Sequence, residues 1–281
     1  MDRATSWCRH SQPRSVYGRY LGKRAVLGAL YLFALAGGGA AFACSLSEGT
    51  RYGLGYSVWF GGVVTAALGT VIAPFVGARV GGLDYDLGTV KEVHLCGRGV
   101  FSEQIWVLGK TIVVGLFLVA AGVLSALVVS TVSGLGDWSW QSTAGLVSPQ
   151  MTSRLLLAWL VGMPFACLVG WSFAVLVRSG FRGALLVAGT IIVYMAGLQL
   201  GRLDLGTDLG TAAALRQVLR FSPWGALLAM TTGSHRHPQV VVVPVLGIVE
   251  SVLAILAWSA VLLFAVRLSL VRRDIGGGGP S

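Results

Sequence analysis

Long runs of apolar residues alternate with shorter polar stretches along the chain, and this pattern predicts most of its structure. A helix needs about 20 consecutive apolar residues to cross the ~30 Å hydrocarbon core of a bilayer. Six stretches come close to this length or exceed it: 25–44, 53–78, 111–131, 155–177, 183–200 and 239–266. Only the last of them contains a charged residue, Glu250. We therefore expect an all-α polytopic membrane protein with six transmembrane helices.

The composition supports lipid as the solvent for much of the surface. Only 11% of the 281 residues are charged and 55% are hydrophobic, with a mean hydropathy of +0.77. A soluble domain has about 25% charged residues, so this chain lacks the polar surface for a large soluble domain. The net charge of +10 does not predict nucleic-acid binding, because the basic residues stand at the ends of apolar segments rather than in one patch.

The distribution of basic residues predicts the orientation. Six spans place both termini on one side, and that side has most of the 21 Lys and Arg residues, in the first 24 residues, the stretch 83–110, the turn 178–182 and the tail. Cytoplasmic loops carry such an excess, so both termini are expected in the cytoplasm. The bias toward Arg, Gly, Ala and Val indicates a GC-rich bacterial genome of the actinobacterial kind. We expect the chain in the cell membrane.

We expect three parts: a cytoplasmic basic arm over 1–24, a transmembrane domain over 25–268 and a cytoplasmic tail over 269–281. The arm fits either a short helix lying in the lipid headgroup plane or a disordered segment. Gly37, Gly38 and Gly39 predict a place where a second helix packs closely. The four cysteines have no paired spacing, so no disulfide framework is expected.

The stretch 83–110 is longer than a connection between two membrane helices requires. It is predicted to be helix, break, helix: a helical run opens at Gly88 and Thr89, the sequence Gly97-Arg98-Gly99 interrupts it, and Ser102 is the N-cap of the next helix. Its expected partner-docking residues are Asp86, Gly88, Thr89, Glu92, Val93, Leu95 and Arg98. We interpret this stretch as a docking site for another protein.

The stretch 201–238, predicted to be external, is also more than a simple loop. A short amphipathic helix over 211–220 is followed by a break, and Ser222 as N-cap with Pro223 as first helical residue begins a second helix that continues through Trp224 to Met230. The second helix is too short to span. The pair is therefore predicted to be a re-entrant hairpin in the outer leaflet, with its polar backbone covered by other helices.

Glu250 is the main candidate for chemistry inside a span. A carboxylate deep in the bilayer costs at least ~2.5–3.5 kcal/mol on insertion scales, so it should face protein or a water-filled cavity. It could contact a substrate or a neighbouring helix along a translocation path, or it could be a structural side chain hydrogen-bonded within the bundle. Its position, near Pro244 and Gly247, is compatible with both.

Other chemistry is not expected. Gly109-Lys110-Thr111 ends like a phosphate-binding loop, but Gln104 stands where the motif needs Gly, so Lys110 is interpreted as an interfacial anchor. The sequence has no Ser-His-Asp, HExxH or paired-carboxylate pattern, and its His and Cys pairs are far apart. We therefore expect no enzymatic activity, no cofactor and no metal site.

Taken together, these features resemble the ABC-2 type permease family, the membrane subunits of ATP-binding-cassette exporters. The resemblance rests on the order of the segments, on Asp84, Asp86 and Gly88-Thr89 before a helical run and on Gly109-Lys110 entering the third span. The turn after Val177, Arg178-Ser179-Gly180, is also similar. One motif differs, because Val100, Ser102 and Glu103 occupy the zone where the family commonly has Pro, a small residue and Arg.

The resemblance implies a coupling helix over about Gly88–Phe101 that docks on a separate ATPase subunit. It also implies a second permease, as a homodimer or heterodimer, and export of a small amphiphilic, drug-like or lipid-like substrate. The alternative is an ion-coupled secondary transporter that uses Glu250. Such a carrier should show inverted repeats and more polar residues within its spans, and the sequence shows neither.

Overall fold

The structure, a computed structural model of the whole chain, describes residues 23–48, 53–86, 100–132, 156–200, 214, 217–232 and 246–275. These residues are almost entirely helical and include no strand. The elements are α3 (Lys23–Glu48), α4 (Gly53–Asp86), α6 (Val100–Val132), η2 (Ala158–Gly162), α8 (Met163–Val177), α9 (Gly180–Leu200), α11 (Pro223–Thr232) and α12 (Ile248–Ile275). Residues 1–22 of the predicted basic arm lie outside the described residues, as do 87–99, 133–155, 201–213 and 233–245, whereas the last two residues of the arm belong to α3.

Six of these helices are long and apolar enough to cross a membrane, as the sequence predicted. The apolar segments are 27–44, 56–83, 104–132, 158–177, 180–198 and 248–270. Large apolar side chains on their outer faces are exposed: Leu35 is 72% exposed, Phe117 74% and Val193 71%. Apolar surface of this extent is unfavourable in water and favourable in lipid. The architecture is compatible with a multi-pass membrane protein.

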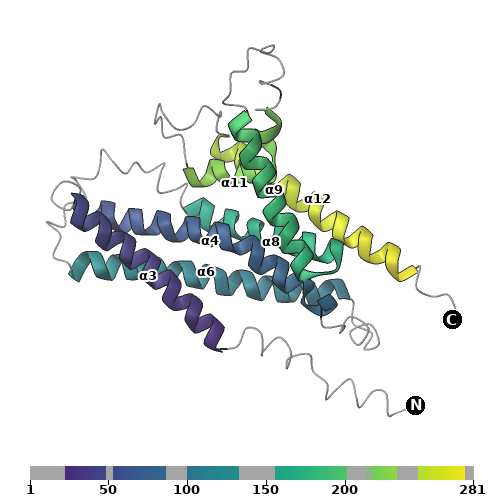
Figure 1. The fold of residues 1–281 in the computed structure, drawn as a ribbon, viewed down its shortest axis with the longest axis horizontal. Helices are drawn as coiled ribbons and strands as arrows, with labels where there is room; N and C mark the ends of the chain where they lie inside the picture. The colour runs from purple at the N-terminus through teal and green to yellow at the C-terminus, as the bar shows by residue number, and fades with distance from the viewer. Residues whose placement is uncertain are drawn as a thin grey trace.

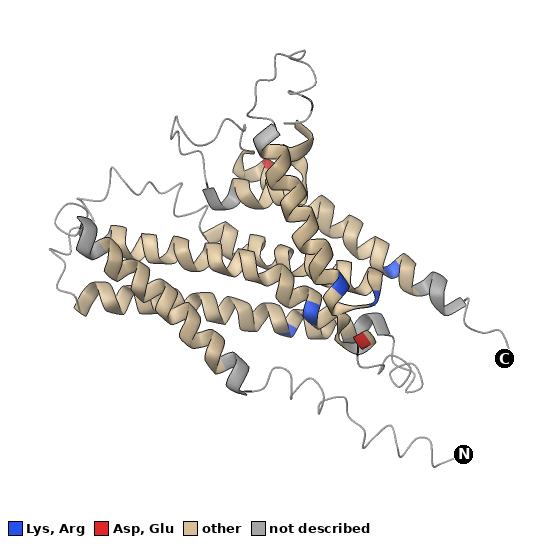
Figure 2. Cartoon of the chain, in the orientation of Figure 1, with Lys and Arg blue, Asp and Glu red and all other residues tan. Residues whose placement is uncertain are grey.

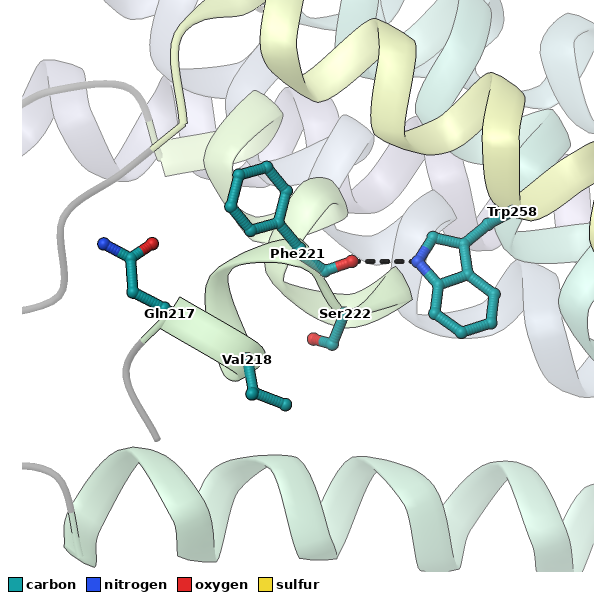
Figure 3. Close-up of a pocket in the computed structure, with 5 residues that line it drawn as sticks. All are labelled: Gln217, Val218, Phe221, Ser222 and Trp258. Carbon is teal, nitrogen blue, oxygen red and sulfur yellow. Dashed lines mark hydrogen bonds between the residues drawn. The ribbon is translucent and has the colours of Figure 1, made fainter. Parts of the chain in front are cut away.

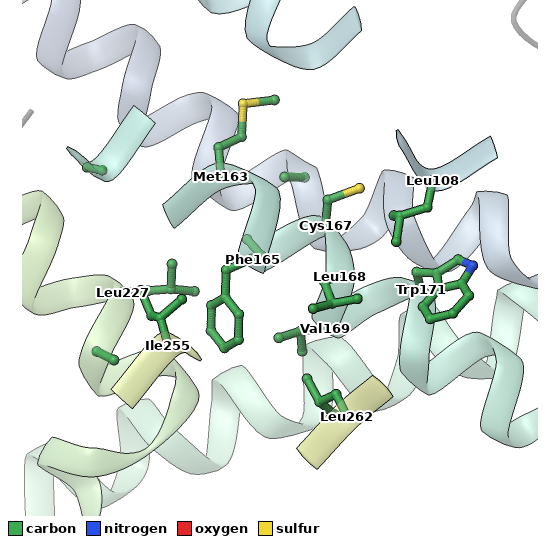
Figure 4. Packing of buried hydrophobic residues seen from close by; sticks show 14 of the residues in the cluster. Leu108, Met163, Phe165, Cys167, Leu168, Val169, Trp171, Leu227, Ile255 and Leu262 are labelled. Carbon is green, nitrogen blue, oxygen red and sulfur yellow. The ribbon is translucent and has the colours of Figure 1, made fainter. Parts of the chain in front are cut away.

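Helices α3, α4 and α6 pack side by side as one group (Figure 1). Helix α8 packs on α4 and α12, α9 packs on both α4 and α8, and α11 packs mainly on α12. The most extensive interface in the described structure is between α4 and α8. A single core follows α8, with Phe165, Leu168, Val169 and Trp171 buried in it, and Ile255 and Leu262 of α12 complete its other side (Figure 4). Helix α8 is therefore the central helix of the bundle.

Glycine lets the backbones of these helices approach each other. A Cβ on Gly77 of α4 would overlap the carbonyl of Cys167 in α8, and one on Gly170 of α8 would overlap the carbonyl of Pro74 in α4. Close backbone approach through small residues is a usual way to pack helices in lipid, where there is no hydrophobic driving force between them. The prediction for the glycine patch is confirmed for Gly37 and Gly38, which face α6, whereas Gly39 has nothing within 4 Å of its Cβ position.

Three helices extend past their predicted ends. Helix α4 continues to Asp86, eight residues past the predicted end of its span at 78. The helix predicted to follow Ser102 is present as α6, but it begins at Val100, so Ser102 lies within its first turn and is not its N-cap. Helix α12 likewise continues to Ile275, past the predicted start of the tail at 269. Backbone hydrogen bonding does not require apolar side chains, so polarity alone does not end a helix.

Helix α8 begins with a single π turn, η2, and the position of Pro164 accounts for it. Proline has no N–H to donate and its ring clashes with the carbonyl four residues earlier. One wider turn at 158–162, directly before Met163 and Pro164, removes this conflict without ending the helix. The span predicted over 155–177 is therefore continuous, although its first turns are not α-helical.

Candidate functional site

Asp86, the one predicted docking residue that the structure describes, links two helices. Its two carboxylate oxygens accept the backbone N–H of Gly180, at 3.3 and 3.2 Å. Gly180 is the first residue of α9, and a helix N-terminus has unpaired N–H groups and a partial positive charge. Asp86 therefore ties the end of α4 to the start of α9. The other predicted docking residues, Gly88, Thr89, Glu92, Val93, Leu95 and Arg98, lie outside the described residues.

A second contact to the same carboxylate is weaker. The Arg79 guanidinium lies 3.4 Å from Asp86 Oδ2, and the side chain of Arg79 is 58% exposed. An exposed ion pair at this distance contributes little, about 0–1 kcal/mol. The main link from Asp86 is therefore the one to Gly180.

The turn between α8 and α9 holds Gly180 in place. Arg178 has a left-handed backbone, with φ 55°, and its N–H bonds the Val175 carbonyl, while the Ser179 N–H bonds the carbonyl of Ala174. A left-handed residue directly after a helix is a common way to end it. Gly82 of α4 lies so close to this turn that a Cβ there would overlap the backbone of Gly180. A tight turn is present as predicted, but it covers only Arg178 and Ser179, because α9 begins at Gly180 rather than at 183. Helix α4 packs directly on this turn.

Basic residues gather at this end of the bundle. Figure 2 shows them where α4 ends, α9 begins and α12 approaches its C-terminal end. The described members of this group are Arg79, Lys110, Arg178, Arg182 and Arg267. Lys110 fits the predicted role of interfacial anchor, because it is exposed and its Nζ lies 3.1 Å from the centre of the Trp106 ring.

At the opposite end, the predicted start of the short helix is confirmed. Ser222 Oγ accepts the N–H of Gly225 at 3.0 Å and donates to the carbonyl of Leu219 at 2.6 Å, and Pro223 is the first residue of α11. Residues 217–221 are helical before this break. The helix–break–helix pattern over Ser222, Pro223 and Trp224 is therefore present.

Helix α12 fixes the break in place. Trp258 Nε1 donates to the carbonyl of Phe221 at 2.8 Å, as the dashed line in Figure 3 marks. An open pocket of about 440 Å³ lies beside this bond, lined by Gln217, Val218, Phe221, Ser222 and Trp258. The indole satisfies a backbone carbonyl that the break leaves without a helical partner, which matters most where no water reaches.

Glu250 lies in the first turn of α12 and not in the middle of a span, so the predicted start of that span at 239 was wrong. Leu246 and Gly247 are not helical and α12 begins at Ile248. Glu250 Oε2 accepts the Gly247 N–H at 3.1 Å and pairs with Arg220 Nη2 at 2.8 Å. The first contact is one half of a capping box, in which an acid at the third helical position bonds the N-cap backbone. This geometry gives the carboxylate a structural role.

The Arg220–Glu250 ion pair connects the break to α12, and its strength can be measured. The side chain of Glu250 is 53% exposed and that of Arg220 20% exposed, so we expect a coupling of about 1 kcal/mol, near the upper limit for surface pairs. Glu250→Gln, Arg220→Gln and the double variant form a double-mutant cycle, read as thermal unfolding of the purified protein in detergent. Additive effects in the double variant would show that the pair contributes no coupling.

Sequence reasoning missed Arg220 and Trp258 as partners. Arg220 is the last residue of the predicted amphipathic helix over 211–220 and Trp258 is one of many aromatic residues in the spans, so only the fold shows which groups they meet. Among the described residues, no three His, Cys, Asp or Glu side chains lie together as metal ligands.

Comparison of the chain with models of known families, with curated proteins and with solved structures gives no match.

Proposed function

We propose that this chain is the permease subunit of a bacterial ATP-binding-cassette exporter in the cell membrane, with both termini in the cytoplasm. A separate ATPase subunit would supply the energy, and a second permease, identical or related, would complete the path. The substrate class that fits is a small amphiphilic, drug-like or lipid-like molecule, because the six spans are almost free of charge. The proposal rests on the sequence resemblance, and the geometry of the inner end supports it.

The observation that carries the proposal is the bond from Asp86 to the Gly180 N–H. Residues 87–99 connect α4 to α6, so a protein that gripped them would act on the end of α4. Asp86 and the close approach of Gly82 to Gly180 join that end to the α8–α9 turn. A force on the connection would then reach both groups of helices, and rigid movement of packed helices is a common way to transmit such a signal.

In the proposed exporter, the end of the bundle that carries α11 serves as a gate. The short helix α11 and residues 217–221 are held to α12 by two contacts, Arg220 with Glu250 and Trp258 with the Phe221 carbonyl. A hairpin attached to one long helix would move with it when the bundle changes shape. An ion-coupled carrier is less well supported, since Glu250 is engaged by Gly247 and Arg220 and caps a helix.

The direct test is copurification. A tagged chain is isolated from its native membranes and the associated proteins are identified; we expect an ATPase of the ABC class, encoded beside this chain. Changing Val93 and Leu95 together to Asp should remove that ATPase, because two charges would enter an apolar docking surface. The matched control changes Val132 and Val218, two exposed valines at the opposite end of the bundle, to Asp and should retain it.

Two results would contradict the proposal. One is a Val93/Leu95 double variant that binds the ATPase and supports its ATP turnover as the unaltered chain does. The other is labelling of Cys96 by a membrane-impermeant maleimide added to intact cells, because the connection 87–99 would then face away from the cellular ATP.

A further inference from the structure

A second cavity lies between the four helices α3, α4, α6 and α8, near the end where α3 and α6 begin. Its volume is about 210 Å³, and it is partly open to the surface. It is lined by Ala29, Leu32, Phe33, Gly69, Ile72, Ala73, Val76, Thr111, Ile112, Val114, Gly115, Leu118, Met163, Pro164 and Cys167. Met163 and Cys167 point away from the core residues Phe165 and Leu168 of the same helix (Figure 4). The cavity therefore lies on the opposite side of α8 from Phe165 and Leu168, and its walls include residues that also belong to the core, such as Phe33 and Ala73.

The lining is apolar, and its one hydroxyl is already satisfied. Thr111 Oγ1 donates to the carbonyl of Val107 at 2.9 Å, so it offers no free donor to a polar ligand. Small residues create the space, since Ala29, Gly69, Ala73 and Gly115 stand where larger side chains would fill it. Protein interiors are close-packed, with few voids larger than a water molecule. A space of this size next to lipid is expected to be filled by an apolar molecule.

The dimensions select the kind of occupant. An apolar cavity of about 150 Å³ already accommodates benzene, while sites for drug-sized ligands have about 300–1,000 Å³. This cavity is thus too small for a whole drug-sized molecule and large enough for part of a hydrocarbon chain. At its rim, Leu32 is 50% and Val76 37% exposed on the surface that faces lipid. A chain could therefore enter from the bilayer while the rest of its molecule stayed outside.

Lys110 lies at the level along α6 where the headgroup of a lipid bound in the cavity is expected. Lys110 lies one helical turn before Val114, which lines the cavity. The backbone of Lys110 is therefore about 6 Å nearer the N-terminal end of α6. The Lys110 side chain is exposed and is held over the ring of Trp106. Lys and Trp side chains at this level of a span are typical anchors at the headgroup region, and each cation there attracts anionic lipid.

We propose that this cavity binds one acyl chain of an anionic phospholipid from the surrounding bilayer, with the lipid phosphate paired with Lys110. The lipid is a resident of the bundle that fills the space between α3 and α6. This site is independent of ATP-driven export, because it requires only that the chain lies in a membrane.

The test is photocrosslinking in vesicles of phosphatidylcholine and phosphatidylglycerol. Trace phosphatidylglycerol or phosphatidylcholine carries a diazirine in the middle of one acyl chain, and the modified peptides are mapped by mass spectrometry. With the phosphatidylglycerol probe, adducts should concentrate on the peptides that contain the lining residues. Ala29→Phe and Leu32→Trp, which fill the cavity and cover its mouth, should each lower these adducts about fivefold, the loss expected from removing a methylene or two of buried chain.

Two control variants separate the parts of the site. Gly28→Phe adds the same ring to the neighbouring residue, which has nothing within 4 Å of its Cβ position, and should leave the adducts unchanged. Lys110→Gln should abolish an about fivefold preference for the phosphatidylglycerol probe over the phosphatidylcholine probe. The site is overturned if adducts spread evenly over the exposed faces of α6, α9 and α12, or if both cavity-filling variants, folded by gel filtration, keep the wild-type yield. Equal labelling by both probes overturns the role of Lys110.

Discussion

Gly170→Ala is expected to destabilise the bundle by about 1–3 kcal/mol or more, the usual cost of overpacking. The new methyl group would overlap the carbonyl of Pro74, with Pro74 C at 2.6 Å and Cα at 2.9 Å. These atoms belong to the backbone of α4, so they cannot move aside as a flexible side chain can. Helices α4 and α8 would have to separate along the most extensive interface in the described structure.

Thermal unfolding in detergent, followed as the loss of the monodisperse peak in gel filtration, measures this effect. Gly189→Ala is the control, because Gly189 lies in α9 with nothing within 4 Å of its Cβ position. Alanine is the better helix former by roughly 0.5–1 kcal/mol, so this variant should unfold at the same temperature or higher. Opposite signs for the two substitutions are the expected result. Gly170→Ala with unchanged stability would show that α4 and α8 do not approach as closely as the structure has them.

Asp86→Ala is expected to uncouple the outer end of the bundle from ATP turnover, if the proposed function is correct. The variant removes the acceptor for the Gly180 N–H and the anion at the start of α9, which lowers stability by only about 1–2 kcal/mol. The ATPase should still bind and hydrolyse ATP, because the carboxylate of Asp86 is engaged by Gly180 and the other predicted docking residues, in 87–99, are unchanged. The movement of α4 would no longer reach α9 through this bond.

A readout at the outer end does not require the substrate. Spin labels at two exposed positions, Val132 at the end of α6 and Val249 at the start of α12, report a distance that should change when ATP and vanadate are added to the complex. In Asp86→Ala the ratio of complexes that show the changed distance to those that do not should fall by about tenfold while ATP turnover persists, since about 1.4 kcal/mol shifts an equilibrium tenfold. The control is Arg79→Gln, which removes only the exposed partner of Asp86 and should keep the change. A full distance change in Asp86→Ala would refute the link.

The sequence was most informative where one local rule decides the structure. Ser222 and Pro223 indicate a helix start for two reasons. The serine hydroxyl can accept the N–H of the third helical residue, and the first helical residue has no N–H partner in the helix, so proline loses nothing there. Gly37 and Gly38 were recognised because small residues mark close packing, but the pattern could not tell that Gly39 faces away from α6. The ends of α4, α6 and α12 were misplaced because hydropathy measures polarity, whereas a helix ends where its backbone bonding ends.

The candidate sites divide in the same way. Asp86 was selected as part of the predicted docking stretch and Glu250 as an acid inside an apolar span, and both choices depend on sequence alone. Their partners, Gly180 and Arg220, are 94 and 30 residues away, so no local pattern could have paired them. The cavity beneath Lys110 was not predicted at all, because its small residues come from four helices and each one alone resembles an ordinary packing residue.

The sequence by itself determined six apolar helices, an excess of basic residues at one end and the break before Pro223, because length and polarity decide which segments can enter lipid and proline favours a helix start. Tertiary structure alone decided that α8 is central, that Asp86 meets the start of α9 and that Glu250 caps α12 beside Arg220. These features depend on how closely two helix backbones approach each other at glycines. The sequence of one helix does not show which other helix it will approach.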